Sequence, residues 1–397
     1  MKDVTGTPSF IRTMNRANVL DLIRRNGSLS QAEIAKKLSL QPSTILRIVN
    51  ELVDEQLIVE IGKTEVGAKG GRRASLLGLN GKGPYAIGID LASDEMIGVL
   101  VNLTGDVICE VRRPFSPESG AAIILDEVKM VVSQLLTSPS IQSEKVLGIG
   151  VSMPGKVNSS EGISVYAIGF KNWRNVPLVK ELESYFQIPV YLEHDIRSMA
   201  FGEIWFGKEC TNMICLGFRR GIGLATIING ELYRGSHEFA GDVGHVVVDP
   251  NGPLCRCGRR GCLEAIASEK AIISQYREYA NQNNLKLESL TMQTIYKEMK
   301  KGTPVVMELV KGAANHMGRV LVDLVRIFDP ERIIIGGNSI ATSLEFQQYI
   351  RSFFQENQPN YADPNMTIES THFGDNCSAV GAAAIILSSL FKPISGT

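Results

Sequence analysis

The sequence predicts a mixed α/β fold, with a small helical domain in front of a larger body of two α/β lobes. From Pro84 onward, strand-like runs alternate with helix-like runs, which is the pattern of α/β proteins. The set of strands occurs twice, once after Pro84 and once after Asn212, which indicates two related halves with a cleft between them. We therefore expect three domains, over residues 1–80, 81–205 and 206–397.

The composition is that of an ordinary soluble protein. The chain has 397 residues, of which 44% are hydrophobic and 21% are charged, and its net charge is −1. A net charge this small provides no overall attraction to nucleic acid or to a membrane surface. No uncharged run is long enough to span a bilayer, and the N-terminus lacks the basic-then-apolar pattern of a signal peptide. We therefore expect a cytoplasmic protein without a membrane partner.

Residues 1–80 are basic and have helical periodicity. They contain twelve Lys and Arg against eight Asp and Glu, a local net charge of +4, so the remainder carries about −5. Apolar spacing predicts three helices, in residues 18–26 and in the stretches SQAEIAKKLSL and QPSTILRIVNELVDEQLI. Gly27 ends the first helix, and Pro42 fits the first turn of the third.

The third helix presents a polar face that suits DNA. This face carries short polar side chains and one arginine, the types that reach base edges and phosphates in a major groove: Gln41, Ser43, Thr44, Arg47 and Asn50. Residues 57–61 and 74–79 can then pair as a hairpin, with Lys69, Arg72 and Arg73 near its tip, where arginines suit a minor groove. The segment resembles a winged helix-turn-helix and predicts binding to double-stranded DNA. The alternative is a small protein-binding module with a solvated basic loop.

The seven cysteines fall into two groups. Four lie scattered in apolar surroundings and indicate reduced, packed thiols: Cys109, Cys210, Cys215 and Cys377. The others follow a histidine in GHVVVDPNGPLCRCGRRGCLEA, so that His245, Cys255, Cys257 and Cys262 offer one imidazole and three thiolates. This donor set suits tetrahedral zinc, and four protein ligands leave no position for an activating water, so the predicted zinc is structural. The alternative is three buried or redox-active thiols beside an unrelated histidine.

Five places along the chain, taken in order, make it similar to a known family. They are IGIDL, SMPGKV, LEHDIRSMAFGE, GDVGH with the cysteine cluster, and IIIGGNSI with GDNCSAVGAAAI. The chain resembles the ROK group (repressors, open reading frames and kinases), which has the two-lobed, ribonuclease H-like fold of actin-like ATPases. The resemblance covers nearly the whole chain and implies zinc at the matching histidine and three cysteines. A winged helix-turn-helix before a ROK body is the layout of the group's transcriptional repressors.

The resemblance implies a catalytic base, but the two loops that bind ATP phosphates in the family's kinases have a different sequence here. Asp195 in LEHDIRSMA matches the aspartate that takes a proton from a sugar hydroxyl in the family's kinases. Those kinases carry D-x-G-G-T after the first strand, whereas this chain has DLASD, and Asp94 places a negative charge where phosphates would bind. Their second loop, G-T-G-I-G, is RRGIG here, although Arg219 and Arg220 could attract phosphate. We expect a vestigial base and no enzyme activity; the alternative is an ATP-dependent ROK sugar kinase.

The resemblance also places a ligand pocket between the lobes. Residues at the family's ligand-binding positions are Gly155, Lys156, His194, Asp195, Asp242, His245 and Glu264. His194 and Gly169 stand where the family has asparagine, and Asp242 stands where it has glutamate. These changes alter the hydrogen-bonding map of a site that binds hydroxyls. We favour a different sugar or sugar derivative as the ligand; a non-sugar metabolite, or a vestigial pocket with a protein partner, are the alternatives.

Together these features predict a homodimeric repressor, or a dimer of dimers, that reads the half-sites of a palindromic operator. A ligand between the lobes would favour one degree of closure and so change the affinity for DNA. The apolar face of residues 313–328 is a candidate dimer contact, with an internal core helix as the alternative. A zinc or redox sensor is a third class, and an activator is also compatible with the sequence.

Overall fold

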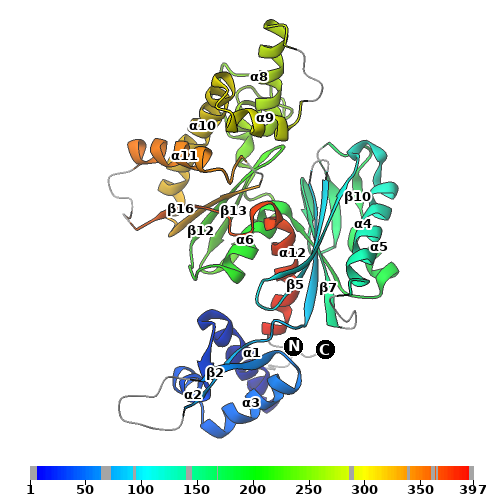
Figure 1. Cartoon of the computed structure of the whole chain (residues 1–397), viewed down its shortest axis with the longest axis vertical. Helices are drawn as coiled ribbons and strands as arrows, with labels where there is room; N and C mark the ends of the chain where they lie inside the picture. Colours follow the sequence, from blue (N-terminus) through cyan, green and yellow to red (C-terminus); the bar gives the residue numbers. More distant parts are fainter. Residues whose placement is uncertain are drawn as a thin grey trace.

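The protein consists of a small N-terminal domain and a body of two α/β lobes (Figure 1). Its structure, a computed structural model, describes residues 7–63, 73–92, 95–139, 145–167, 169–285, 290–337, 340–358, 363 and 365–392. Every one of the three parts has its own sheet. The mixed α/β architecture predicted from the sequence is confirmed.

The N-terminal domain has three helices and a three-stranded sheet. Its elements are α1 (Pro8–Asn26), β1 (Leu29–Ser30), α2 (Gln31–Leu38), α3 (Pro42–Asp54), β2 (Ile58–Lys63) and β3 (Ser75–Leu79). The hydroxyl of Ser30 accepts a hydrogen bond from the backbone N–H of Glu33, and the Glu33 carboxylate accepts one from the Ser30 N–H, so α2 begins with a capping box. The β2–β3 hairpin has the predicted position, and Lys69 and Arg72 between its strands lie outside the described residues.

The first lobe is built on a five-stranded sheet in the order β11-β7-β4-β5-β6. These strands are β4 (Tyr85–Leu91), β5 (Glu95–Asn102), β6 (Val107–Pro114), β7 (Val146–Met153) and β11 (Val190–His194). Helices α4 (Ala121–Leu136) and α5 (Leu178–Phe186) cover its outer face (Figure 1). A second, small sheet holds β8 (Lys156–Asn158), β9 (Ile163–Tyr166) and β10 (Arg174–Val176). The parallel strands β4, β7 and β11 end at one edge of the large sheet, so polar residues after them meet there.

The second lobe repeats this strand order. Its sheet runs β14-β13-β12-β15-β16 and consists of β12 (Met213–Phe218), β13 (Ile222–Ile228), β14 (Glu231–Tyr233), β15 (Arg332–Gly336) and β16 (Thr367–Ser370). In both lobes the first strand is central, with two antiparallel strands on one side and two parallel strands on the other. The prediction of two related halves is therefore confirmed.

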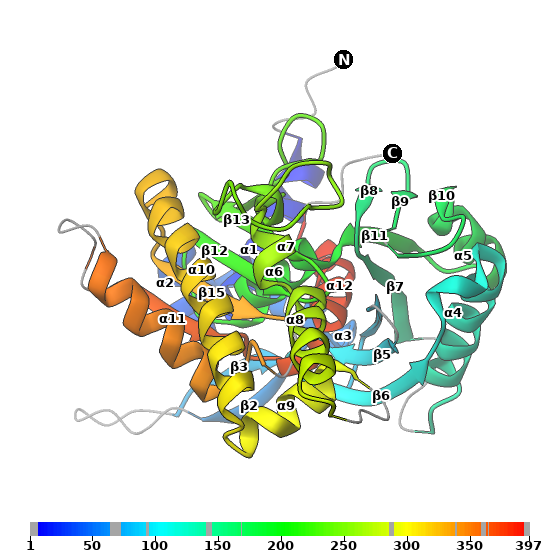
Figure 2. The ribbon, with the colours of Figure 1, turned by 90° about the horizontal axis from the view of Figure 1, so that it is seen from above.

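Helices cover the outer face of the second sheet. They are α7 (Leu263–Ala267), α8 (Glu269–Gln282), α9 (Met292–Lys300), α10 (Pro304–Phe328) and α11 (Leu344–Asn357). Helices α10 and α11 lie side by side along this lobe (Figure 2). The apolar stripe of α10, including Val310, Met317 and Leu321, is buried in the core of the lobe. The internal-helix alternative thus explains the stripe without a partner chain.

Two helices lie between the sheets of the two lobes, α6 (Asp195–Phe206) and α12 (Cys377–Ser388) (Figure 1). Glycines allow their close approach, since a Cβ on Gly381 of α12 would lie 1.7 Å from the carbonyl oxygen of Ser198 in α6. Although α12 falls in the range 206–397, it packs against β4 and β7 of the first lobe. The window Gly374–Phe391 is long and apolar enough to cross a membrane, but 61% of it is buried inside the protein, as in a core helix.

One hydrophobic cluster continues from the N-terminal domain into the body. It combines Val19 and Ile23 of α1 with Val101 of β5 and with Leu387 and Phe391 at the end of the α12 region, all of them buried. The N-terminal domain is therefore packed onto the body and not merely tethered to it.

Candidate functional site

The histidine and three cysteines of the sequence motif come together in the second lobe. One ligand atom each from His245, Cys255, Cys257 and Cys262 lies within 4.8 Å of all the others. The Cys257 and Cys262 sulfurs are 3.5 Å apart, close to the separation of about 3.8 Å that tetrahedral Zn–S bonds of about 2.3 Å require. The cluster therefore fits a single metal ion, and its soft donors match zinc.

The loop that carries these ligands depends on a glycine and an arginine. Gly261 has a φ of +69°, and a Cβ there would lie 1.4 Å from the carbonyl oxygen of Asp249. The Arg259 guanidinium donates to the carbonyl oxygen of His245 at 2.6 Å. The backbone N–H of Arg259 also lowers the pKa of the Cys257 thiol to about 6, which favours the thiolate form that metals bind.

Asp195 and His194 stand at the interlobe edge of the first sheet, where β11 ends and α6 begins. One carboxylate oxygen of Asp195 accepts a hydrogen bond from the backbone N–H of Ile196 at 2.8 Å and lies 3.2 Å from Nδ1 of His194. The His194 ring faces the second lobe, because its Cε1 lies 3.8 Å from where a Cβ of Gly223 would be. The predicted base thus lies buried at the boundary between the two lobes, with its side chain 8% exposed.

The other predicted ligand-binding residues of the second lobe, Asp242 and Glu264, lie beside the cluster of His245 and three cysteines. The Asp242 side chain is 66% exposed, and its Oδ1 is 4.0 Å from Nε2 of His245. The Glu264 carboxylate accepts two hydrogen bonds from Arg256, at 2.6 and 3.2 Å. It also lies 2.5 Å from where a Cβ of Gly221 would be, so the metal loop and the second phosphate-type loop are in contact.

The predicted residues of the first lobe lie on β8 and the turn before it. Gly155 has a φ of +93°, and a Cβ there would lie 2.2 Å from the carbonyl oxygen of Tyr166. The Lys156 ammonium lies 3.7 Å from the centre of the Phe239 ring, which belongs to the second lobe. Lys156 therefore connects the two lobes.

The two loops that would hold nucleotide phosphates are joined by an ion pair. Arg219 follows β12 and donates to Asp90 of β4 at 2.8 Å, and the same guanidinium nitrogen is 3.9 Å from Asp195. Asp90 also accepts a hydrogen bond from the Ser152 hydroxyl at 3.0 Å. Burial raises the pKa of Asp90, while Arg219 opposes this shift. Asp94 lies outside the described residues.

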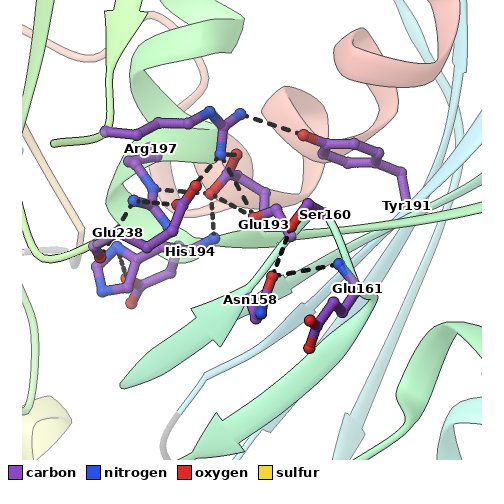
Figure 3. Close-up of polar contacts among 11 residues, drawn as sticks. Asn158, Ser160, Glu161, Tyr191, Glu193, His194, Arg197 and Glu238 are labelled. Carbon is purple, nitrogen blue, oxygen red and sulfur yellow. Dashed lines mark hydrogen bonds and ion pairs between the residues drawn. The ribbon is translucent and has the colours of Figure 1, made fainter. Parts of the chain in front are cut away.

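A buried polar network that the sequence analysis did not identify lies beside the cleft (Figure 3). Glu193, which is fully buried, accepts a hydrogen bond from Arg197 at 2.7 Å and forms an ion pair with Arg234 of the second lobe. Arg197 also forms an ion pair with Glu238 at 2.8 Å, and Arg234 donates to the Tyr191 hydroxyl at 3.1 Å. The spacing of Glu193 and Arg197, four residues apart, was the available signal, but their second-lobe partners are distant in sequence.

The predicted DNA-binding residues lie on one face of α3. Gln41, Ser43, Arg47 and Asn50 are exposed, and Thr44 is half-buried. The opposite face of α3 is buried in the domain core. Arg73 is exposed just before β3. This face therefore remains accessible to a macromolecular partner.

The fold and these sites define a winged helix-turn-helix domain joined to a sugar-kinase-like body. The chain belongs to the ROK family, because the model of that family matches residues 86–389. A second model, described as winged helix-turn-helix DNA-binding, matches residues 15–59. The prediction of a ROK family regulator with an N-terminal winged helix-turn-helix is thereby confirmed.

Similar proteins include regulators that match along their whole length. The xylose repressor of Bacillus subtilis (strain 168) is 29% identical over 384 residues, 96% of each chain. The dual regulator NagC of Escherichia coli (strain K12) is 28% identical over 396 residues, which cover 98% of this chain and 96% of NagC. The crystal structure of a ROK family transcriptional regulator, a homolog of the E. coli MLC protein, is 25% identical with a TM-score of 0.79 and covers 96% of this chain and 97% of its own.

A kinase of the family matches the body. The ROK family glucokinase from Streptomyces griseus, in complex with glucose and AMPPNP, is 25% identical with a TM-score of 0.68. The match covers 98% of the kinase but 76% of this chain.

Proposed function

We propose that this protein is a transcriptional repressor that binds operator DNA through its winged helix-turn-helix and releases it when a sugar-type ligand enters the interlobe cleft. The observation that carries the proposal is the position of α6. This helix begins with Asp195 in the cleft and ends beside the N-terminal domain. A ligand that moves one end of a packed helix also moves the other, because close-packed interiors transmit displacement.

Direct contacts support this connection. The Arg24 guanidinium of α1 lies 4.1 Å from the centre of the Trp205 ring near the end of α6 and donates to the Trp205 carbonyl oxygen. Arg25 pairs with Glu209 just beyond α6 at 2.8 Å. The α12 region provides a parallel route, since Cys377 begins it near the cleft and Phe391 ends it in the cluster shared with α1.

The ion pair between Arg219 and Asp90 argues against the kinase alternative. It places a protein cation and its counter-ion between the loops where a kinase holds ATP phosphates. A nucleotide would have to break this buried pair and then bind next to the carboxylates of Asp90 and Asp195. Asp195 is then a hydrogen-bond acceptor for a ligand hydroxyl and not a base.

The metal centre, as we propose it, is a structural zinc site. His245, Cys255, Cys257 and Cys262 would complete a four-ligand shell, which stabilises a loop and provides no open position. Such a zinc holds the loop before α7, and with it Asp242 and Glu264, beside the cleft. Chemistry at the metal has no part in the proposed function.

We further propose a homodimer, or a dimer of dimers, on a palindromic operator. Exposed side chains of α3 would enter the major groove, while Arg73 and the hairpin tip, with Lys69 and Arg72, would contact the adjacent minor groove. A cytoplasmic location accords with this role.

The experiment that tests the proposal combines two measurements on the zinc-loaded protein. Operator fragments are selected from random or genomic DNA, and their affinity is measured by fluorescence anisotropy with and without a panel of sugars and sugar derivatives. ADP release is measured with ATP and the same panel, using Asp195→Asn as the control. We expect one sugar-type ligand to weaken operator binding and no ADP release. Turnover that disappears in Asp195→Asn would instead establish the kinase alternative, and failure to select any DNA would exclude a repressor.

A further inference from the structure

We infer that the cleft takes a negatively charged carbohydrate, a sugar acid or a sugar phosphate, and that Arg220 binds its anionic group. This inference rests on the ligand-responsive cleft proposed above and specifies the chemistry of its ligand. It starts from three features of Arg220: its anchored neighbour, its position across the cleft, and its lack of a counter-ion.

Arg219 fixes the loop from which Arg220 projects. Because the Arg219 guanidinium is held by Asp90 of the first lobe, the backbone of the next residue is held close to that lobe. The backbone N–H of Arg219 also donates to the carbonyl oxygen of Gly221 at 2.9 Å, which closes the loop around Arg220. The two consecutive arginines thus have different roles, since one is buried in an ion pair and the other is exposed.

The Arg220 side chain crosses to the first lobe and lies over a glycine. Its Nη1 is 2.8 Å from where a Cβ of Gly169 would be, so the guanidinium fills the space that a side chain at residue 169 would take. Gly169 has a φ of +84°, a conformation that side chains with a Cβ rarely adopt. The absence of a side chain at this position therefore lets a cation lie between the two lobes.

Within the described part of the chain, the Arg220 guanidinium has no hydrogen-bond acceptor or carboxylate partner. The nearby acidic groups are already engaged: Asp90 is paired with Arg219, and Glu264 accepts both of its hydrogen bonds from Arg256. A guanidinium has five N–H donors in a planar fork that matches a carboxylate or a phosphate. Its donors are therefore free for an anion from solution.

A second cation, Lys156, lies on the hairpin of β8 and β9, which precedes Gly169 in the chain. Lys156 pairs with Tyr166 across β8 and β9, and Tyr166 precedes Gly169 by three residues. The Lys156 ammonium contacts the Phe239 ring, and no carboxylate of the described residues lies within ion-pair distance of it. The acids nearby, Glu193 and Glu238, are neutralised by arginines instead (Figure 3).

The remaining hydrogen-bond acceptors indicate that the ligand also carries several hydroxyl groups. The Asp242 carboxylate is exposed, and that of Asp195 lies beside His194 at the boundary between the lobes. These groups can accept hydrogen bonds from hydroxyls, whereas they would repel a second anionic group. The site thus matches a molecule with several hydroxyls and one anionic group held by Arg220.

The test measures ligand affinity by isothermal titration calorimetry on the zinc-loaded protein. The probes are matched sets of a neutral hexose, its hexuronate and its hexose 6-phosphate, in the gluco, galacto and manno series. We expect one charged probe to bind at least about tenfold tighter than its neutral counterpart, as a charge-assisted hydrogen bond implies. Arg220→Gln should remove this preference and Arg220→Lys should retain part of it. The control Arg277→Gln changes an exposed arginine on α8 and should have no effect.

Two results would overturn the inference. One is a neutral hexose that binds as tightly as its charged counterparts with no change in Arg220→Gln, and the other is a panel in which no charged probe binds. Operator binding by the ligand-free protein is recorded for each variant. If the wild-type protein binds operator but shows no charge preference, only the anion site is refuted. If the wild-type protein binds no operator, the proposed repressor function is refuted. Preference for hexuronate or for hexose 6-phosphate identifies the source of the charge.

Discussion

At the residue scale, the pair of Arg219 and Asp90 has the largest energetic consequence. The Asp90 side chain is fully buried and that of Arg219 is 11% exposed, so each is the main counter-charge of the other. A buried charge that loses its partner cannot be rehydrated, which is why removing one member of such a pair costs more than the pair itself contributes.

We predict that Arg219→Ala lowers the free energy of unfolding by about 3 kcal/mol at neutral pH. Arg326→Ala is the control, because its ion pair with Asp323 is exposed and should contribute less than about 0.5 kcal/mol. Urea unfolding, followed by tryptophan fluorescence, measures both. Equal effects of the two substitutions would mean that the pair is solvated.

The same variant should depend on pH. Burial raises the pKa of Asp90 and Arg219 lowers it, so removal of Arg219 raises the pKa of the folded state further above that of the unfolded chain. Folding then takes up a proton, and stability falls as the pH rises through the folded-state pKa. The loss caused by Arg219→Ala should therefore be smaller near pH 5 than near pH 8. A loss that grows on acidification would contradict this sign.

The metal ligands allow a second prediction at this scale. Cys262→Ser should lower zinc affinity by more than about 100-fold, since loss of a direct ligand exceeds the cost of losing a supporting contact. Cys109→Ser, a half-buried thiol outside the cluster, should leave zinc content unchanged. Metal content after dialysis, measured by mass spectrometry, distinguishes the two. A wild-type protein without bound zinc would favour the redox-thiol alternative.

At the element scale, the contact between α6 and α12 determines how the two lobes are joined. Each helix packs against the other through backbone atoms at glycine positions, so the pair behaves as a single block between the sheets. Gly381→Ala should reduce the free energy of unfolding by about 3 kcal/mol, because its Cβ would lie 1.7 Å from the Ser198 carbonyl oxygen. Gly312→Ala in α10 meets nothing within 4 Å and should stabilise by about 0.5–1 kcal/mol. Thermal and urea unfolding of both variants check this opposite sign.

The end of α6 tests the route from the cleft to DNA. Arg24→Ala removes the contact with Trp205 and should bring the ligand-induced change in operator affinity, typically about 5–150-fold, close to unity. Ligand affinity and ligand-free operator affinity should each change less than this ratio. Arg12→Ala is the control, since Arg12 pairs with Glu51 inside the N-terminal domain. An unchanged ratio in Arg24→Ala would show that coupling follows another route.

What sequence could predict depended on how far apart the partners are along the chain. The cluster of one histidine and three cysteines was predictable because His245 and Cys262 are 17 residues apart and their chemistry is distinctive. The two related halves followed from the repeated pattern of apolar runs, whereas the order of the strands in each sheet did not. In contrast, Asp90 and Arg219 are 129 residues apart and belong to different lobes, so neither residue alone signals the pair. The Glu193 network and the position of Arg220 over Gly169 were not predictable for the same reason, because their partners are distant in sequence.

At the scale of the whole molecule, the proposed dimer would use the exposed face of α3 as one half of a recognition unit. A single winged helix contacts one half-site, and a second copy is needed for a palindrome. We predict a mass in solution of at least twice 43.4 kDa, measured by light scattering, and binding to a full operator at least about tenfold tighter than to a half-site. Arg47→Ala should cost about 1–3 kcal/mol of operator affinity for each site. A monomeric mass with equal affinity for both DNA fragments would exclude the dimeric arrangement.

The pair of Arg219 and Asp90 also has a physiological consequence. In a kinase body that closes when ATP binds, the fraction of closed molecules depends on the ATP concentration in the cell. In the repressor that we propose, the ion pair of Arg219 with Asp90 would stand where a kinase binds nucleotide, and its formation would not depend on the ATP concentration. We therefore expect gene control by this protein to follow the availability of one nutrient and to ignore the energy charge of the cell. We expect equal operator occupancy in starved and well-fed cells that contain the same amount of inducer.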